Sequence, residues 1–487
     1  MTRRSPLGLL IAAFPSLLAA CAVGPDFERP AAPAVQTYDA ADLPEAERTA
    51  ETAPEVKFGE KIPARWWTLF HSSALEQTLR LVVASNNTLT AARATLAQAQ
   101  QAVIVAEAGF LPQVDLQAGA ERSGTAGLSA TAGGITSTYY SIGPTFGYTV
   151  DLFGLTRRTV EQQEALAEYQ QYQLAAAYLT LTGSAVTEAI AIAAARLQIA
   201  TALELIASDQ KNLDLVRRKF DVGKAARTDV LTAESQLFGD RSQLSSLRQQ
   251  LSVARHALAV LASRSPAEWS PPEFDIKDFE LPPDVPAVVP SALIHQRPDI
   301  LAAEAQLHAD GAAVGVATAQ LYPTLTLSAA LTQQSLSAAT LFESASTLWS
   351  VGANVAQPIY HGGALQAQKQ AAVDAFDAQY ATYKQTVIVA FGQVADALRA
   401  LDHDAEFVTN ARQSLGVSEE SLALQRASYA VGKTSVLDLI VAERAYAQAK
   451  LAYAAAQIQQ FQDTAQLFVV LGGGWRDAEG LPGAPHE

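Results

Sequence analysis

The chain has 487 residues, of which 49% are hydrophobic and only 17% are charged. Its length allows two or three ordinary domains, and its richness in alanine indicates helices that approach closely rather than a bulky core. The formal net charge of −15 argues against nucleic acid as a partner and is compatible with an acidic, water-filled surface.

The N-terminus has the pattern of a secretory signal. Two arginines precede an apolar run that ends in Leu-Ala-Ala-Cys at Cys21, the only cysteine, so an intramolecular disulfide is excluded. This run resembles the bacterial lipobox. The resemblance implies that residues 1–20 are a signal peptide and that Cys21 carries a diacylglycerol and an N-acyl lipid; an ordinary signal peptide with an incidental cysteine is the alternative. Ala22, in place of an aspartate, resembles lipoproteins sorted to the outer membrane.

The segment 21–65 is rich in proline and alanine and shows no sustained period, which predicts an extended tether from the lipid anchor. Trp66 and Trp67 begin the folded part and are more typical of packing than of a site. Later in the chain, Glu188 interrupts the best candidate for a spanning helix, so we expect any membrane crossing to use strands.

Four stretches alternate between apolar and polar residues. They follow helical patterns, the first of which runs over Ser73–Gly109 and is closed by Pro112. Aromatic residues such as Tyr148 and Trp349 lie on the apolar side, and the lengths suit strands of an outer-membrane barrel, although a half-buried soluble sheet would alternate in the same way. The four stretches are residues 113–121, 140–151, 324–332 and 349–359.

The number of strands bears on the assembly. Lipid permits no open sheet edge, so four strands cannot span a membrane alone. Two chains would give a barrel of eight strands that its own side chains fill, whereas three chains give twelve strands with room for water. Because the inward face is polar, the sequence predicts a homotrimer.

A very long helical pattern follows the second strand of each pair, at Leu155–Lys219 and Ala364–Ser428. At about 1.5 Å per residue each would span roughly 97 Å, too long for a compact core. Heptad-like spacing predicts coiled-coil packing between the first long helix and the helix that returns from it; a cytoskeletal rod would lack the strands. The heptad positions are Ile199, Leu203, Ile206, Leu213, Val216 and Phe220, then Leu237, Leu244, Leu247, Leu251, Leu258 and Leu261.

The segment Phe220–Glu234 recurs as Tyr429–Glu443, and both copies contain Val-Gly-Lys, an aspartate and a final Ala-Glu. Gly223 and Gly432 lie 209 residues apart, which indicates an internal duplication too long for a solenoid repeat. Since glycine can leave a helix through positive φ, each copy predicts a helix-turn-helix tip.

The duplication sets the expected domains. We expect a first repeat at 66–262, an irregular linker at 263–290 that contains seven prolines, a second repeat at 291–471 and a loose, glycine-rich tail at 472–487. Pro298 is expected in the first turn of the helix that restarts the second repeat.

Together these residues resemble a known family, the TolC-like outer membrane factors, and within it the NodT-type lipoproteins of resistance-nodulation-division efflux systems. The resemblance covers nearly the whole mature chain. It rests on the order and spacing of motifs that are weak singly: the lipobox with VGPDF, Trp66-Trp67, FLPQV at 110–114, YTVDLFG at 148–154, RPDILAAEAQL at 297–307, LYPTLTL at 321–327, QPIYHGG at 357–363 and the two Val-Gly-Lys tips.

The resemblance implies a mainly α fold with transmembrane β-strands. A trimeric 12-stranded outer-membrane β-barrel, with four strands per protomer, would continue into a long periplasmic α-helical barrel. It implies a lipid-anchored outer-membrane channel, the exit duct of a tripartite efflux system that passively conducts small hydrophobic or amphiphilic compounds. The partners would be a periplasmic adaptor, an inner-membrane pump of the resistance-nodulation-division type and outer-membrane lipid.

The resemblance also implies roles at the tips, which would form a periplasmic mouth. Tyr429 and Asp229, with Thr228 beside it, would form a latch between helix pairs, while Asp438 would give one carboxylate per protomer to an acidic ring that favours cations. Arg444 would partner those carboxylates. An ordinary helix-flanking aromatic and a helix N-terminal carboxylate are the alternatives for Tyr429 and Asp229.

Adaptor contact is implied for the tip residues, although the lysines are equally well explained as solvated charges. These residues are Gly223, Lys224, Gly432 and Lys433. The chain departs from the family at Thr434 and Val441, where some members carry arginine and aspartate, which weakens the expected closure of the mouth.

An enzyme is not expected. None of the seven histidines falls at metal-ligand spacing, so we expect no metal site and no cofactor beyond the covalent lipid. The fragments Asp151–Gly154 and His361–Gly363 lack the context of the catalytic motifs that they resemble. Two other functions stay open: a periplasmic coiled-coil adaptor or scaffold, and the exit duct of a type I protein secretion system.

Overall fold

The computed structural model describes residues 22–33, 35, 37–38, 55–125 and 135–477. The chain forms two compact units, each assembled from separate parts of the sequence. Unit 1 contains residues 1–30, 95–170 and 302–384, and unit 2 contains residues 31–94, 171–301 and 385–487. Cys21 lies outside the described residues.

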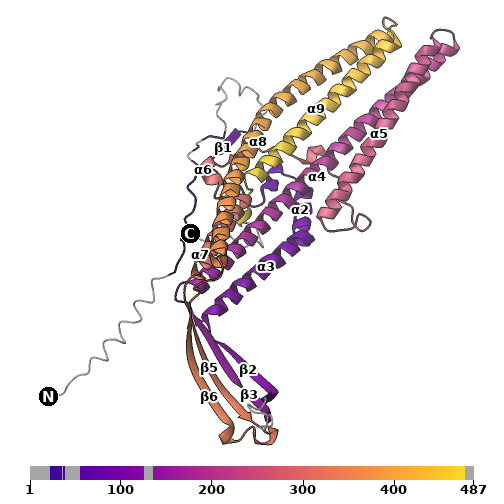
Figure 1. The fold of residues 1–487 in the computed structure, drawn as a ribbon. Coiled ribbons are helices and arrows are strands. Elements are labelled where there is room, and N and C mark those ends of the chain that lie inside the picture. Colours follow the sequence, from indigo (N-terminus) through magenta and orange to yellow (C-terminus); the bar gives the residue numbers. More distant parts are fainter. Residues whose placement is uncertain (1–21, 34, 36, 39–54, 126–134, 478–487) are drawn as a thin grey trace. The chain divides into compact units, whose positions relative to one another are not determined.

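Four long helices show the duplication directly (Figure 1). Helix α4 (Leu155–Asp221) and helix α8 (Ala364–Ala430) have 67 residues each, and α5 (Arg227–Leu261) and α9 (Val436–Val470) have 35 each. Every bound in the second pair lies 209 residues after its counterpart in the first. The two internal repeats are therefore confirmed, with each long helix two residues longer than predicted.

The four alternating stretches form one antiparallel sheet in unit 1. Its order is β2 (Gln113–Thr125), β3 (Ile135–Val150), β5 (Thr324–Ser335) and β6 (Thr347–Ala356). The last prediction reached too far, because β6 ends at Ala356 and Ile359 lies beyond it, next to Pro358, which has no backbone N–H to donate.

The register places most apolar residues of the four strands on one face, since residues paired across neighbouring strands share a face. One such row is Val114, Phe146, Ala329 and Val351. The row beside it, on the opposite face, is Asp115, Thr145, Ala330 and Ser350. In the single chain the apolar face is uncovered: Leu116, Trp349 and Val351 are 73%, 77% and 77% exposed. The sheet is thus amphipathic from edge to edge.

The helices before the sheet differ in detail from the prediction. The helical pattern Ser73–Gly109 is broken at Asn86 into α2 (Ser73–Ser85) and α3 (Asn87–Glu107). Asn86 has an extended backbone, and its Oδ1 accepts the N–H of Leu89, so it ends one helix and caps the next. In the second repeat, α7 (Pro298–Ala319) begins at the proline expected in its first turn.

Segments predicted to be irregular are packed. In the expected tether, β1 (Glu55–Phe58) pairs in parallel with β4 (Asp284–Ala287), which lies within the proline-rich linker. The start of the expected loose tail is also ordered, with Trp475 buried and its indole N–H donated to the carbonyl of Gln296. The other short elements are η2 (Trp66–Phe70), η3 (Ala108–Phe110), η4 (Ile276–Asp278), α6 (Pro290–Leu293), η5 (Ala338–Thr340), η6 (Ser344–Ser346) and η7 (Trp475–Asp477).

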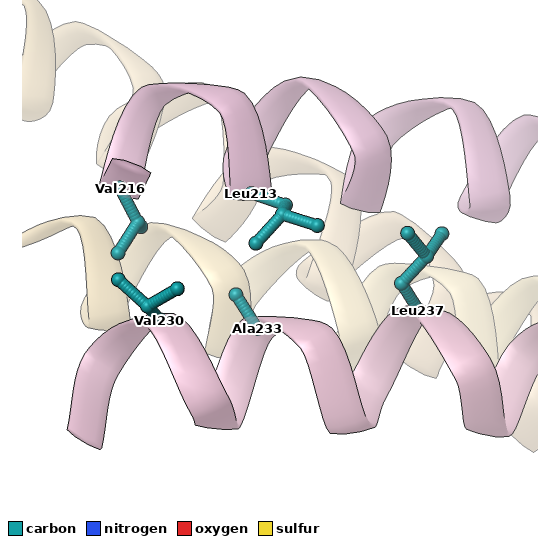
Figure 2. Packing of buried hydrophobic residues seen from close by; sticks show 5 residues of the cluster. All are labelled: Leu213, Val216, Val230, Ala233 and Leu237. Atoms are coloured by element: carbon teal, nitrogen blue, oxygen red, sulfur yellow. The ribbon is translucent and has the colours of Figure 1, made fainter. Parts of the chain in front are cut away.

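The heptad prediction is confirmed near the first tip. Leu213 and Val216 of α4 pack against Val230, Ala233 and Leu237 of α5 in a buried cluster (Figure 2). Further along, Ala202 packs with Leu244 and Leu247. Two predicted heptad positions are wrong: Leu203 and Phe220 are exposed in the chain, and the small neighbour Ala202 is buried where the helices approach closely.

The core of unit 2 contains the expected packing tryptophans. Trp66 is fully buried and contacts Trp67, Phe70 and Phe468. Against the expectation for Glu188, α4 does carry one stretch long and apolar enough to cross a membrane by composition alone. Ile190 and Ile192, which follow Glu188 in this helix, are fully buried in the protein.

Candidate functional site

Each predicted tip is a tight turn between two long helices of unit 2. Gly223 has φ 71° and Gly432 has φ 74°. At the first tip the Gly223 N–H donates to the carbonyl of Phe220 (2.9 Å) and the Lys224 N–H to that of Lys219 (2.7 Å). The second tip repeats both bonds, from Gly432 to Tyr429 (3.0 Å) and from Lys433 to Ser428 (2.9 Å). These paired bonds satisfy the last carbonyls of each helix, so glycine ends both helices as predicted.

Asp229 and Asp438 occupy equivalent places in the first turns of α5 and α9. Asp229 Oδ2 accepts the N–H of Ala226 (2.9 Å). Asp438 Oδ2 accepts both the hydroxyl (2.7 Å) and the N–H (2.9 Å) of Ser435. These bonds to Ser435 lower the pKa of Asp438, which keeps that carboxylate charged. In the single chain both aspartates therefore cap helices, and the proposed latch and acidic ring stay predictions.

The other predicted residues of the mouth have local partners as well. The Tyr429 ring packs beside Leu422 and Leu439 and lies under the ammonium group of Lys219, 4.7 Å from the ring centroid. The carbonyl of Thr228 accepts the hydroxyl of Thr232 (2.9 Å). Where the chain departs from the family, the Thr434 hydroxyl is buried without a hydrogen-bond partner and Val441 is exposed.

Arg444 has a partner on another helix of the same chain. Its guanidinium Nη2 is 3.8 Å from Asp240 Oδ1 on α5. Arg444 therefore links the second repeat to the first within one chain, and its expected pairing with the ring of Asp438 carboxylates stays a prediction.

The structure adds a residue that the sequence analysis missed, Glu443, whose side chain is 10% exposed. Its Oε2 accepts bonds from Ser208 and Asn212 of α4, both 2.7 Å, and Arg426 of α8 donates to its Oε1 (3.2 Å). A charged group buried this deeply needs such partners. Glu443 thereby joins three helices drawn from both repeats.

The duplicated sequence held a signal for this site. Glu443 is the last residue of the repeated motif, and its counterpart Glu234 pairs with Arg217 (2.7 Å). Arg217 and Arg426 are themselves 209 residues apart, so the two ion pairs are repeat equivalents. Glu443 also accepts bonds from Ser208 and Asn212 of α4, a helix of the other repeat, and no local pattern reveals this contact between distant segments.

Next to Arg444 a cavity of about 460 Å³ lies between α4, α5 and α9, lined by Thr201, Asp240 and Arg444 among others. A second cavity of about 440 Å³ lies nearer the first tip and includes Asp209, Lys224 and Asp229 in its wall. Asp209 is buried, and burial together with Asp240 raises its pKa to about 7.

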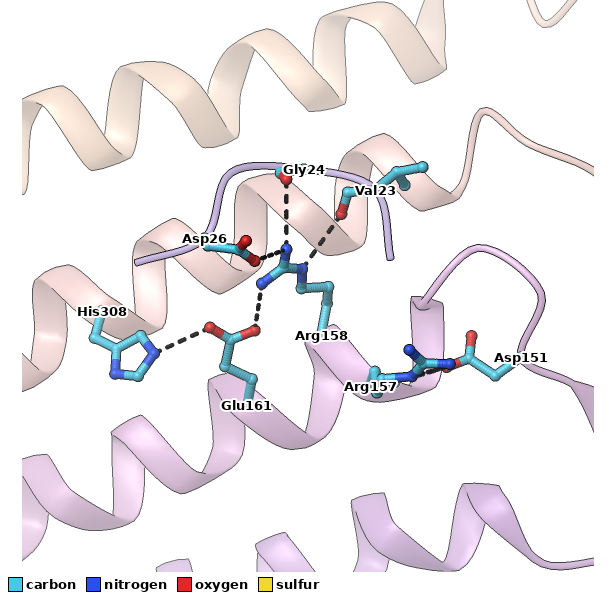
Figure 3. A network of polar contacts seen from close by, with 8 residues as sticks. All are labelled: Val23, Gly24, Asp26, Asp151, Arg157, Arg158, Glu161 and His308. Atoms are coloured by element: carbon cyan, nitrogen blue, oxygen red, sulfur yellow. Dashed lines mark hydrogen bonds and ion pairs between the residues drawn. The ribbon is translucent and has the colours of Figure 1, made fainter. Parts of the chain in front are cut away.

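In unit 1 the residues that follow Cys21 are bound by a buried arginine, Arg158, in the first turn of α4 (Figure 3). Its guanidinium donates to the carbonyls of Val23 (3.3 Å) and Gly24 (3.4 Å) and pairs with Asp26 (2.7 Å) and Glu161 (2.7 Å). The Val23 N–H donates in turn to the carbonyl of Phe153 (3.0 Å).

The same segment contacts α7 of the second repeat. Phe27 stacks on His308 at 4.3 Å between centroids, and the imidazole Nε2 lies 3.0 Å from Glu161 Oε1. A Cβ on Gly24 would lie 2.5 Å from the Cα of Gly315, so only glycine allows this approach. The described start of the predicted tether is thus docked, and it joins the two repeats.

Across the described ranges, no group of three or more His, Cys, Asp and Glu side chains is placed to hold a metal ion.

Comparison with known proteins gives consistent similarities. A family model described as outer membrane efflux protein matches twice, at residues 78–263 and 289–473. The chain is 30% identical over 476 residues to nodulation protein T of Rhizobium leguminosarum bv. viciae, covering 96% of this chain and 93% of that protein. It is 28% identical over 484 residues to the toluene efflux pump outer membrane protein TtgC of Pseudomonas putida, covering 98% and 97%.

Solved structures agree with this similarity. The outer-membrane channel OprN superposes with a TM-score of 0.84 at 27% identity, over 93% of this chain and all of that one. The CmeC outer membrane channel of Campylobacter jejuni superposes at 0.82 and 22% identity, which shows a shared fold. The predicted fold class is therefore confirmed.

Proposed function

The chain belongs to the outer membrane efflux protein family, and on that premise we propose that it is the exit duct of a tripartite efflux system. It is an outer-membrane channel protein and not an enzyme. The observation that carries the proposal is the sheet, whose four strands present one apolar face from edge to edge and an opposite polar face. That arrangement suits lipid on one side and water on the other.

The open edges of the sheet support a homotrimer. In the described chain, β2 and β6 are the outer strands and each pairs on one side only. Unpaired backbone groups are not tolerated in hydrocarbon, so both edges must pair with strands of sister subunits. Three copies give twelve strands and an interior wide enough for water.

The long helices also carry apolar surface that sister subunits would cover. Phe238 and Val260 of α5 and Val417 and Leu424 of α8 are each more than half exposed in the single chain. Exposed apolar residues at this density along a helix are typical of an interface. They support an α-helical barrel formed between subunits.

The tips supply the proposed mouth. Lys224 and Lys433, each one residue after the helix-ending glycine, are exposed at the turns and suit contact with a periplasmic adaptor. Three features would operate between subunits of the closed mouth. They are the latch of Tyr429 with Asp229 and Thr228, the ring of Asp438 carboxylates and the pairing of Arg444 with that ring. Energy would come from the inner-membrane pump, of the resistance-nodulation-division type.

The cargo is proposed at the level of class, as small hydrophobic or amphiphilic compounds. Among the relatives, one is named for toluene efflux and another for pyoverdine export. The lipid on Cys21 is proposed from the lipobox, and the docked segment after it supports an anchor held close to the body.

The test uses full-length protein extracted from outer-membrane fractions. We expect a heat-resistant trimer on gels and stepwise single-channel conductance in planar lipid bilayers. A monomer without conductance would overturn the duct and favour the periplasmic scaffold. In another outcome, the protein conducts while a deletion strain still tolerates toxic compounds as well as the wild type does. If that strain also no longer exports a secreted protein, the result would favour the type I secretion duct.

A further inference from the structure

Each long hairpin contains two aspartates that face each other across its two helices. In the first hairpin these are Asp209 on α4 and Asp240 on α5. Asp209 is only 3% exposed, its Oδ2 has no hydrogen-bond donor, and its carboxyl lies within hydrogen-bonding reach of the Asp240 carboxyl. A buried carboxylate oxygen that faces another carboxylate is stable only if a proton lies between them.

The surrounding charges leave the first pair one cation short. Three carboxyl groups meet here, those of Asp209, Asp240 and Glu443, with two guanidinium groups. Arg426 pairs with Glu443 (3.2 Å) and Arg444 lies beside Asp240 (3.8 Å). Gln236 Nε2 also donates to Asp240 (3.0 Å).

Arg444, which lies beside Asp240, also lowers the pKa of Asp209, but other effects outweigh it. Burial, followed by the Asp240 carboxyl, raises the pKa of Asp209 to about 7.

The second hairpin contains the same arrangement at other positions. Asp404 on α8 is 7% exposed and its Oδ2 also has no hydrogen-bond donor. Burial, then the facing Asp463 on α9, raises the pKa of Asp404 to about 7. The positions 209 residues after Asp209 and Asp240 hold Ser418 and Ala449, so the second pair is not a copy of the first.

We propose that each aspartate pair shares one proton, and that this proton joins the two helices of its hairpin. When the proton leaves, the two carboxylates repel each other across the helix pair. In the first hairpin, Arg444 then remains beside Asp240, so the contact from α5 to α9 persists while the contact from α4 to α5 weakens. This holds for the chain whether or not it transports the proposed cargo.

The sign of the pH dependence follows from the raised pKa. An aspartate in the unfolded chain loses its proton near its ordinary pKa of about 4, whereas the paired aspartates keep theirs until about 7. The native state thus binds more protons between these values, and its stability falls as pH rises through that range. Above about 7 the helix pairs are held less tightly.

The test is infrared spectroscopy of the full-length protein in detergent, recorded at pH values from about 5 to about 9 so that they bracket the raised pKa of the aspartate pairs. The C=O stretch of a protonated carboxyl is distinct from that of a carboxylate. We expect the wild type to lose this band as pH passes about 7. Asp209→Asn should remove the part due to the first pair, and Asp209→Asn with Asp404→Asn the part due to both.

The matched control is Asp214→Asn, which removes an exposed carboxyl on the same helix that accepts a bond from Gln210 (3.1 Å). The band should be unchanged in this variant. Asp240→Asn serves as a second variant of the first pair if Asp209→Asn does not fold. A wild-type spectrum without a titrating band near neutral pH, or equal bands in wild type and both pair variants, would overturn the shared proton.

Discussion

Replacing Arg158 with alanine tests the docking of the N-terminal segment. The guanidinium, whose side chain is 6% exposed, holds that segment through the carbonyls of Val23 and Gly24 and through Asp26. Each carbonyl bond contributes about 0.5–1.5 kcal/mol, and the ion pair contributes less because Asp26 is 92% exposed. The loss is therefore about 2 kcal/mol, or roughly a thirtyfold larger population of the released segment.

Hydrogen–deuterium exchange of the full-length protein measures this population. The reporter is the Val23 amide, which donates to the carbonyl of Phe153 and should exchange roughly thirtyfold faster in Arg158→Ala. Arg157→Ala is the matched control, because Arg157 is the neighbouring residue, half-exposed and 3.8 Å from Asp151. Unchanged protection in Arg158→Ala, or an equal loss in the control, would refute the role of Arg158.

The other predictions concern unit 2. Tyr429→Phe combined with Asp229→Ala should raise single-channel conductance severalfold by loosening the mouth, and unchanged conductance would remove both residues from the latch. Leu213→Ala should destabilise the first tip by about 2–5 kcal/mol because it opens a cavity in a buried cluster. Exchange of the α4–α5 amides would show this, while Leu203→Ala, at an exposed position, should change little. Asp438→Ala should expose the Ser435 amide at neutral pH, because the Asp438 carboxylate accepts that N–H. Since hydrogen bonds lower the pKa of Asp438, the wild type should show the same exposure only as pH falls below about 4; equal exchange in both proteins at neutral pH would contradict the capping role.

Much of the fold was predictable because its signals are local. Alternation of apolar and polar residues identified the strands, and the two glycines of the repeated motif located the ends of the long helices to within a few residues. Asn86 was missed, because an asparagine between two helical patterns does not by itself distinguish a break from a continuous helix.

Contacts between distant segments were not predictable from one sequence. The pairing of β1 with β4 joins residues more than two hundred positions apart, and each strand is only four residues long. Trp475 follows three glycines that indicate a loose tail, and its burial is decided by Gln296 and the neighbouring core.

The candidate site divides in the same way. Capping by Asp438 follows from Ser435 three residues earlier, a local spacing. The link from Glu443 to Ser208 and Asn212, and the facing of Asp209 and Asp240, depend on how α4, α5 and α9 are placed around one another. The charges and the apolar periodicity of the sequence do not by themselves predict which faces of the long helices contact each other.

The equal lengths of the two hairpins limit how this protein can change during evolution. Deleting a single helical turn from α4 would shorten its hairpin by about 5.4 Å while α8 and α9 kept their full length. Insertions and deletions in these helices should therefore survive only in compensating sets, and related sequences should differ in hairpin length by the same amount in both halves.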